Sequence, residues 1–336
     1  MQKFSFLSYN VFLRPFGVTM RGNDRKNERC AEIAGRVLPC YDVVCLQEAF
    51  ATLGGGRVDS IRRALVDRDY TVVTQWDAAF HSNYMVDSGL LIASRLAVDR
   101  VSFHEFEATG GGLGETLVGK GVLYAALCTE RKQRVHVFVT HLNSERPEVR
   151  RSQLAELIHF VKRAIGFWGE AAAPLIVCGD FNIDTLATAT ANSNEIAVLR
   201  DAAERLALKD GLSARGLTYG SGDPFYQSTF AAATPIAPQR IDHVLSRGLV
   251  RTNERIELGW ANAGAPYRTL SDHAGVAVEM SFNPSSRVAA GAPVPLPASP
   301  LVPNPRPYAS RRRRRRGHRK RWCCYSRHCC CVSARK

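Results

Sequence analysis

Two periodicities of apolar and polar residues follow one another between Lys3 and Phe282, and together they predict strands and helices. Short apolar runs bounded by polar residues are typical of buried strands. They occupy residues 3–11, 41–47, 88–94, 122–130, 134–142, 174–180, 240–246 and 274–282. Apolar residues at helical spacing occupy residues 27–38, 147–166 and 194–208, and the second of these segments begins with Pro147. This mixture, without an internal repeat, predicts a layered α/β fold.

The composition changes after Phe282. Residues 285–307 are dominated by Pro and Ala, which is typical of an extended, semi-rigid linker. The segment RRRRRRGHRKRWCCYSRHCCC follows at residues 311–331. We therefore expect one folded domain at residues 1–284, a Pro/Ala-rich linker at residues 285–310 and a disordered Arg/Cys-rich tail at residues 311–336.

The formal net charge of +14 is concentrated at the C-terminal end. Thirteen of the 45 Lys and Arg residues lie within residues 304–336, which contain no Asp or Glu, so the preceding residues carry 32 basic and 31 acidic side chains. A domain so close to neutral lacks the strong overall basic field of a duplex-binding protein, although it leaves room for a local basic patch.

The cysteines divide in the same way. Those of the domain are scattered singly, several of them in strand-like runs, and they are Cys30, Cys40, Cys45, Cys128 and Cys178. This pattern indicates reduced, buried thiols rather than a disulfide framework. The first residues, MQKFSFLSYN, do not resemble a secretory signal, and the best apolar run is interrupted by Glu170 and Pro174. We expect an intracellular protein.

The stretch GETLVGKG at residues 114–121 matches part of a nucleotide-binding P-loop. A P-loop continues with Ser or Thr, whose hydroxyl holds Mg²⁺, and it leads from a strand into a helix. Here Gly121 follows Lys120, and the next residues, VLYAAL, have the pattern of a strand. We therefore expect no bound nucleotide.

Polar residues that can hold metals or move protons lie where the predicted strands give way to loops. They are Asn10, Glu48, His141, Asn143, Asp180, Asn182, Asp242, Asp272 and His273. Each one alone is typical of an ordinary turn or a solvated strand end, but their order and types together match one known pattern. We assign no chemistry to the histidines outside that pattern, which are His81, His104, His136 and His159.

At these residues the chain resembles the Mg²⁺-dependent endonuclease/exonuclease/phosphatase superfamily, over about residues 3–282. The most diagnostic matches are Gln47-Glu48, G-D-x-N at residues 179–182 and S-D-H at residues 271–273. The resemblance implies a DNase-I-like four-layer α/β sandwich, in which two mixed β-sheets are flanked by helices and the strand-end loops meet in one cleft. Residues 1–284 would then be a catalytic phosphodiesterase domain.

The resemblance also implies roles, and the hydrolysis of a phosphate ester explains the residue types. The reaction needs neutralised phosphoryl oxygens, an activated water and an in-line leaving group. Glu48, assisted by Asn10, would hold Mg²⁺, a hard cation that prefers oxygen ligands, with Mn²⁺ as an alternative ion. Asp272 would lie near the metal or the leaving group.

The remaining matches would act on protons and on the substrate. His273 would take the proton from the attacking water, and Asp242 would orient the imidazole as in other His–Asp pairs. Asp180 would position the water, Asn182 would donate to a phosphoryl oxygen, and His141 would stabilise charge or supply a proton on the leaving side.

Within the superfamily, the chain is most similar to the neutral sphingomyelinase branch. In that branch an acidic residue, usually Asp, stands five positions before a Lys-Gly pair that begins a strand, and the acidic–lysine interaction is thought to gate the active site. Glu115, Lys120 and Gly121 match this arrangement with Glu in place of Asp. The segments VTHLNS, which contains Asn143, and RIDHVLS also resemble the branch. The resemblance therefore implies hydrolysis of sphingomyelin to ceramide and phosphocholine, with Glu115, Lys120 and Asn143 in gating or substrate binding.

Three alternatives stay open. A nuclease of the same superfamily acting on DNA is supported by the basic tail, but not by the near-neutral domain. An inositol-polyphosphate 5-phosphatase has less support, because GDFNID and QRIDHV replace the extended signatures of that branch. An inactive binding module with the same fold would not need the intact set from Asn10 to His273.

The tail indicates an anionic membrane surface as a partner. Arg311–Arg316 and the following HRKRW are strongly basic, and five cysteines lie beside them at residues 323–331. Clustered cysteines next to a polybasic segment are typical of S-palmitoylation, and an acyl chain combined with a basic patch anchors stably. We expect peripheral membrane association near the lipid substrate. The alternatives are that the tail binds nucleic acid or that its cysteines bind a metal. The Cys spacing is irregular for a metal site.

Overall fold

The computed structural model describes residues 3–15, 25–51, 56–78, 82, 84–170, 172–187, 190–208, 216–220, 237–259 and 261–282. All of these residues lie within the compact unit formed by residues 1–304. The linker and tail predicted from the sequence lie outside the described residues. Among the described helices, none combines the length and apolarity needed to cross a membrane.

The first of two β-sheets has six strands in the order β10-β11-β1-β2-β4-β3. Its strands are β1 (Lys3–Leu13), β2 (Val43–Ala49), β3 (Thr71–Thr74), β4 (Leu91–Ser94), β10 (Leu249–Glu257) and β11 (Gly275–Phe282). The central pair β1–β2 is parallel, and the other neighbouring strands are antiparallel. The carboxyl ends of β1 and β2 therefore lie at the same edge of this sheet.

The second sheet has five strands in the order β5-β6-β7-β8-β9. Its strands are β5 (Ala97–Glu105), β6 (Gly121–Cys128), β7 (Arg134–His141), β8 (Leu175–Asp180) and β9 (Asp242–Arg247). Here β7 and β8 are the parallel pair, and β9 runs antiparallel to β8. The end of β7, the end of β8 and the start of β9 consequently share one edge.

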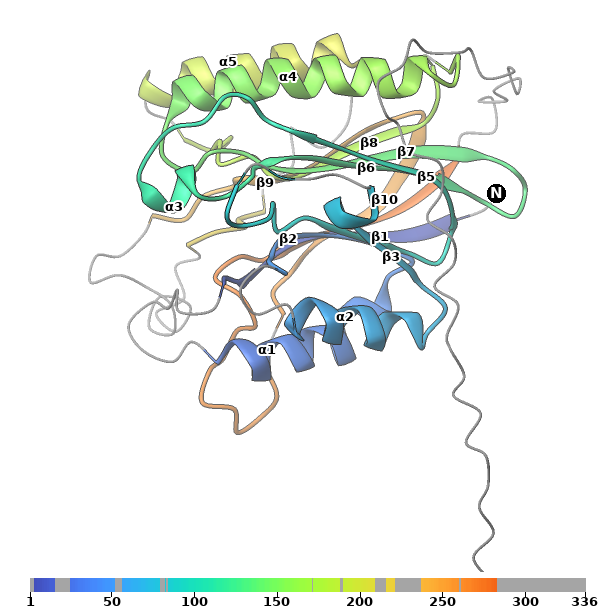
Figure 1. Ribbon diagram of the computed structural model, residues 1–336, viewed down its shortest axis with the longest axis vertical. Coiled ribbons are helices and arrows are strands. Elements are labelled where there is room, and N and C mark those ends of the chain that lie inside the picture. The colour runs from blue at the N-terminus through green and yellow to red at the C-terminus, as the bar shows by residue number, and fades with distance from the viewer. Residues whose placement is uncertain are drawn as a thin grey trace, which may run out of the picture. The chain divides into compact units, whose positions relative to one another are not determined.

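Helices cover the outer face of each sheet. Next to the first sheet lie α1 (Lys26–Glu32), which continues through a π-helical turn (Ile33–Val37) and a 3₁₀ turn (Leu38–Cys40), and α2 (Gly56–Val66). Next to the second sheet lie α4 (Pro147–Gly166) and α5 (Thr190–Arg205). The remaining helical segments are short, namely a 3₁₀ turn (Gln75–Ala78) and α3 (Leu113–Thr116). Figure 1 shows the four layers in order from α4 and α5 to α1 and α2.

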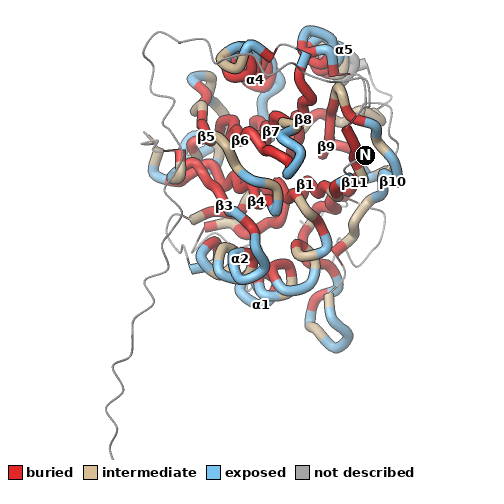
Figure 2. The backbone as a smooth tube through the Cα atoms, turned by 90° about the vertical axis from the view of Figure 1, so that its right-hand side faces the viewer, coloured by how far each residue is buried: buried red, intermediate tan, exposed pale blue. Residues whose placement is uncertain are grey.

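Three apolar clusters hold the layers together. One cluster fills the space between the two sheets and includes Phe6, Val43, Val137 and Ile176, all fully buried. The other two lie between each sheet and its own helices. Figure 2 shows buried residues along most strands of both sheets, whereas the edge strand β10 and the outer faces of the helices are exposed. The inter-sheet cluster sets the spacing between the strand edges that carry the polar residues.

These layers confirm the predicted four-layer α/β sandwich of two mixed sheets. The helix predicted at residues 147–166 has those bounds in α4, and Gly121 begins β6 directly after Lys120, as predicted. The prediction that the scattered thiols are buried was wrong for one of them. All five described cysteines are free, but Cys40 is exposed because it ends the 3₁₀ turn instead of lying in a strand.

Candidate active site

Polar residues from both sheets meet at the shared edges of the parallel strand pairs. Asn10 lies near the end of β1 and Glu48 near the end of β2. In the second sheet, the register places His141 opposite Asp180, and Asp180 opposite Asp242. The alignment of three adjacent strands thus determines which side chains are neighbours.

Just before Asp180, the backbones of β7 and β8 lie so close together that only glycine fits. Gly179 has φ +138°, and a Cβ atom at this position would lie 1.9 Å from the carbonyl oxygen of Thr140. Any other residue would push the strands apart or twist the end of β8. Beyond the strand, the backbone N–H of Asn182 donates to Asp180 Oδ1 over 2.9 Å. This hydrogen bond fixes the orientation of the carboxylate.

Asn10 links the two sheets through its side-chain amide. Its Nδ2 donates to Glu48 Oε1 over 3.2 Å and to Asp180 Oδ2 over 3.1 Å, and it lies 3.4 Å from His273 Nε2. Its Oδ1 accepts the N–H of Phe12 over 3.2 Å, where the backbone turns with a positive φ. The irregular end of β1 therefore aims this amide at the centre of the site.

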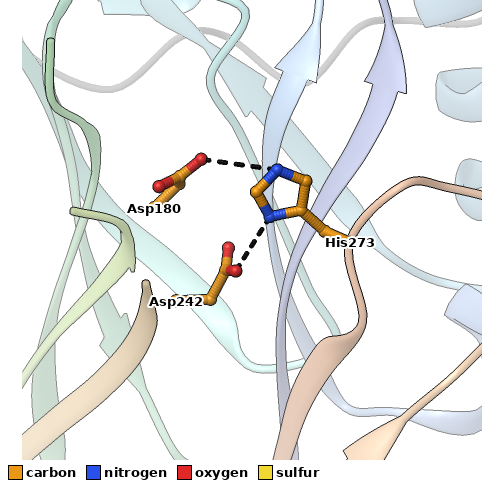
Figure 3. Close-up of side chains that lie close together, drawn as sticks. All are labelled: Asp180, Asp242 and His273. Carbon is orange, nitrogen blue, oxygen red and sulfur yellow. Dashed lines mark hydrogen bonds and ion pairs between the residues drawn. The ribbon is translucent and has the colours of Figure 1, made fainter. Parts of the chain in front are cut away.

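His273 and Asp242 form a buried pair. Asp242 Oδ2 lies 2.8 Å from His273 Nδ1, while the opposite ring nitrogen, Nε2, lies 3.7 Å from Asp180 Oδ2. Figure 3 shows both carboxylates beside the imidazole, with Asp180 facing one ring nitrogen and Asp242 the other. The ring is supported by Ser271, whose Oγ accepts the N–H of His273 over 3.2 Å and donates to the carbonyl of Asn10 over 2.6 Å.

The site holds more negative than positive charge. Burial and the neighbouring Asp242 raise the pKa of Asp180 to about 7, although His273 opposes the shift. Burial and Glu48 likewise raise the pKa of Asp272 to about 6, against the opposing charge of His273. Burial alone would lower the pKa of His273, but Asp242, Asp180 and Asp272 outweigh it and raise that pKa to about 10. These shifts mark carboxylates that lack enough positive partners.

The carboxylates fit a divalent cation. The ligand atoms of Asp180, Asp242 and His273 lie within 4.8 Å of one another. Glu48 Oε2 and Asp242 Oδ1 are buried and have no hydrogen-bond partner in the described part of the chain. Buried, unpaired carboxylate oxygens next to surplus negative charge are the donor set that Mg²⁺ prefers, and Mn²⁺ accepts the same ligands. Because His273 Nδ1 already contacts Asp242, the oxygens of Glu48, Asp180 and Asp272 are the better ligands.

On the other side of Asp180 lie His141 and the predicted gating pair. His141 Nε2 is 3.5 Å from Asp180 Oδ2. Burial, together with the positive charges of Lys120 and His273, holds the pKa of His141 well below its usual range. The Lys120 ammonium donates to the Leu142 carbonyl over 2.7 Å and lies 3.2 Å from Glu115 Oε1. The ion pair between Glu115 and Lys120 is therefore present, next to the end of β7.

Two predicted polar residues contact the protein backbone here. Asn182 Nδ2 donates to the Leu142 carbonyl over 3.1 Å, the same oxygen that Lys120 contacts. Asn143 is buried and orders the loop before α4, since its Oδ1 accepts the N–H groups of Glu145 and Arg146 and its Nδ2 donates to the Gly110 carbonyl. In the structure Asn143 therefore orders the loop before α4, whereas Asn182 lies beside Asp180.

Sequence reasoning missed two residues at the site. The ring of Tyr219 lies 4.7 Å from that of His273, and burial and the charges of Asp272, Asp180 and Glu48 raise its pKa. The fully buried Arg29 of α1 donates to the carbonyls of Val11, Phe12 and Leu270, which connects the end of β1 to the loop before His273. Neither residue has a sequence signal, because each acts through tertiary contacts.

A model of the Endonuclease/Exonuclease/phosphatase family matches residues 7–273. The match covers most of the chain, and the protein therefore belongs to this family, whose members are generally phosphoric diester hydrolases. No curated protein matches the sequence.

Several solved structures share the fold. A magnesium-bound beta toxin mutant from Staphylococcus aureus has a TM-score of 0.60 and 19% identity, over 82% of this chain and 99% of the toxin. Sphingomyelinase C from Streptomyces griseocarneus has a TM-score of 0.61 and 21% identity, over 83% of this chain and 99% of the enzyme. Truncated TDP2 from Caenorhabditis elegans has a TM-score of 0.55 and 17% identity, over 84% of this chain and 98% of the TDP2 chain. At these identities the likeness shows the fold.

Proposed function

We propose that the protein is a Mg²⁺-dependent phosphodiesterase that hydrolyses sphingomyelin to ceramide and phosphocholine by in-line attack of an activated water. One observation carries the hydrolase assignment. The buried His273–Asp242 pair presents Nε2 of the imidazole to Asp180 and Asn10, beside carboxylate oxygens that have no partner. This arrangement supports a general base, a water-positioning carboxylate and a cation site next to one another.

His273 takes a proton from the attacking water at Nε2, while Asp242 holds the Nδ1–H group and orients the ring. Asp180 and Asn10 position that water, and Glu48 with Asp272 would hold the cation. When bound, the cation would supply charge neutralisation at the phosphoryl oxygens. Asp272 is one of the carboxylates that raise the pKa of His273, so its neutralisation by the cation would bring that pKa back towards the range of a general base.

His141 and Asn182 act on the other side of the phosphoryl group. The low pKa of His141 keeps its imidazole neutral at pH 7, which favours hydrogen-bond donation to developing negative charge over transfer of a proton. Asn182 shares the Leu142 carbonyl with Lys120 and can turn its amide towards a phosphoryl oxygen.

Two observations favour sphingomyelin as the substrate. The pair Glu115–Lys120 occupies the place that the neutral sphingomyelinase branch uses for its gate, and Lys120 reaches the backbone next to His141 and Asn143. The similar structures include a sphingomyelinase C. Glu115 has one methylene more than the usual Asp, and its Oε1 also accepts a hydrogen bond from Ser144 over 2.6 Å, so we propose that Ser144 helps to hold the gate closed.

The basic and Cys-rich tail would hold the enzyme at its substrate. We propose that acylation of Cys323–Cys324 or Cys329–Cys331, with the adjacent arginines, anchors the protein to an anionic membrane surface. Membrane association that is lost on treatment with hydroxylamine, which cleaves thioesters, would support acylation. A wholly soluble, unlipidated protein in its native cell would end this proposal.

The activity is tested by offering the full chain several substrates in parallel, with Mg²⁺ or with EDTA. The substrates are sphingomyelin vesicles, lysophospholipid, abasic duplex DNA and inositol phosphates. We expect Mg²⁺-dependent release of phosphocholine, which His273→Ala abolishes and His159→Ala, a change at an exposed histidine of α4, leaves intact. Nicking of DNA without phosphocholine release would assign the protein to the nucleases. No turnover of any substrate would favour a binding module.

A further inference from the structure

Arg14 is a cation at the site that no predicted role uses. Its Nε and Nη2 atoms are buried, and neither has a hydrogen-bond partner among the described residues. Arg14 also makes no ion pair in that part of the chain. Burying guanidinium donors without partners is costly, and native structures keep such groups mainly where a ligand or ion completes them.

The Arg14 side chain has a fixed position. Its guanidinium carbon lies 4.3 Å from the centre of the Phe12 ring, a cation–π contact, and Phe12 has a backbone φ of +50°. Arg57 Nη2 donates to the Arg14 carbonyl over 3.0 Å. The turn that orients Arg14 is the one in which the Phe12 N–H bonds Asn10 Oδ1, so one short segment aims both the Asn10 amide and the guanidinium.

The Phe12 ring that contacts Arg14 also lies 5.6 Å from the guanidinium carbon of Arg29. Arg29 in turn donates to the carbonyl of Leu270, two residues before Asp272, so Arg14 lies on the side of the site where the loop with Asp272 begins. Lys120, the cation on the opposite side, is already engaged by Glu115 and the Leu142 carbonyl. Arg14 is thus a positive group beside the site whose buried donors are unused.

We propose that Arg14 forms a phosphate-binding subsite, in which Nε and Nη2 donate to the non-bridging oxygens of the substrate's phosphoryl group. The planar guanidinium presents these two donors side by side, in the geometry that matches two oxygens of one phosphate. The subsite rests on the proposed function only in requiring a phosphate diester, whatever its organic groups. It complements the cation, because the two hold the phosphoryl group from different sides.

The test measures the binding of inorganic phosphate and of phosphocholine to the full chain by calorimetry, with Mg²⁺ present. Arg14→Met keeps an apolar contact with Phe12 but removes the two guanidinium donors. We expect it to weaken phosphate binding by about 10- to 100-fold. Arg14→Lys keeps the charge and should lose less. Arg151→Met, at an exposed arginine of α4, is the matched control and should bind phosphate like the wild type.

Titration with Mg²⁺ alone separates this role from a simple counter-charge. Removing a cation near Asp272 should leave Mg²⁺ affinity unchanged or increase it, while phosphate affinity falls. Unchanged phosphate affinity in folded Arg14→Met, or an equal loss in Arg151→Met, would overturn the proposal. If Arg14→Met does not fold, Arg14→Gln and Arg14→Lys take its place, and wild-type phosphate affinity in both would overturn it. A protein that binds phosphate through Arg14 but does not cleave sphingomyelin would refute the proposed substrate alone.

Discussion

Two buried histidine–carboxylate clusters lie at opposite ends of β7, and they have opposite electrostatics. At the start of the strand, His136 Nδ1 lies 2.9 Å from the Tyr124 hydroxyl and Nε2 lies 3.3 Å from Glu170, whose other oxygen accepts a hydrogen bond from Arg134 over 2.6 Å. Beyond its end, His273 contacts Asp242, which among the described residues has no arginine partner and keeps one unpaired oxygen. The first cluster is neutralised internally and the second is not.

The pKa values follow from this difference. Burial lowers the pKa of His136, because Glu170 is already shared with Arg134. The pKa of His273 is raised to about 10 despite burial, because Asp180 and Asp272 add uncompensated negative charge to that of Asp242. The same pair of residue types is therefore structural where charges balance and suited to ligand binding where they do not.

The substitution His273→Ala, set beside His136→Ala, tests most strongly whether the two clusters differ in function. If His273 is the general base, the variant should lose about 10³-fold or more in kcat while remaining folded. His136→Ala should instead keep its kcat and lose stability, because Tyr124 and Glu170 lose a buried partner. Steady-state kinetics and urea unfolding of both variants check the prediction, and equal losses of kcat would contradict it.

A second pair of variants removes one carboxylate charge from each cluster. Glu170→Gln should lower the free energy of unfolding by about 2–3 kcal/mol, since it breaks a pair with Arg134 that is largely buried. Asp242→Asn should destabilise the protein less in EDTA, because the relief of repulsion with Asp180 offsets part of the lost attraction to His273, but it should reduce kcat. Urea unfolding in EDTA measures both, and the idea of unbalanced charge fails if Asp242→Asn is the more destabilising of the two.

The pH dependence of stability tests the unbalanced charge of the cluster around His273. The pKa values of Asp180 and Asp272 rise from 3.8 in the unfolded chain to about 7 and about 6, so the EDTA-treated protein should lose stability as pH rises from about 4 to about 7. His273, raised from 6.5 to about 10, stabilises the folded state below pH 6.5, and this contribution is lost as pH rises to about 10.

The loss between pH 5 and pH 8 should be several kcal/mol, because the three shifts act in the same direction, and Mg²⁺ should raise the thermal midpoint more at pH 8 than at pH 5. Thermal unfolding with Mg²⁺ or EDTA at several pH values provides the measurement. A midpoint in EDTA that rises from pH 5 to pH 8 would have the wrong sign for this explanation.

The smallest effect on activity is expected at Glu115. Glu115→Gln should also lower the free energy of unfolding by about 2–3 kcal/mol, because the ion pair with Lys120 is largely buried. If the pair gates the site, kcat/KM towards sphingomyelin vesicles should change several-fold, whereas Glu148→Gln, at an exposed residue of α4, should have no effect. Identical kinetics of the two variants would remove the gating role.

The sequence was informative where local pattern and burial agree. The helix α4 was predicted at both ends because Pro147 begins a long amphipathic segment, and the site residues were found because they follow apolar strands. The helix α2 was missed, since only Val58, Ile61 and Leu65 are buried in it. The strand β10 was missed because most of its residues are exposed at a sheet edge.

Other features depend on tertiary contacts that no sequence window contains. Arg29 reaches the carbonyl of Leu270 across 241 positions of sequence. The balance of charge at His136 depends on Glu170 and Arg134, which the fold brings together from different segments. The family pattern in the sequence could therefore single out His273, but the difference in electrostatics between His273 and His136 needed coordinates.

The division of the site between two sheets has a consequence for when the protein can act. Asn10 and Glu48 belong to one sheet, and His141, Asp180 and Asp242 belong to the other, so neither half of the sandwich carries a working set. A nascent or partly unfolded chain in which only one sheet has formed would be unable to hydrolyse anything. If the protein hydrolyses phosphate esters as proposed, its activity would report that the whole sandwich has assembled, and deleting a methyl group from the apolar layer between the sheets should reduce turnover from a distance.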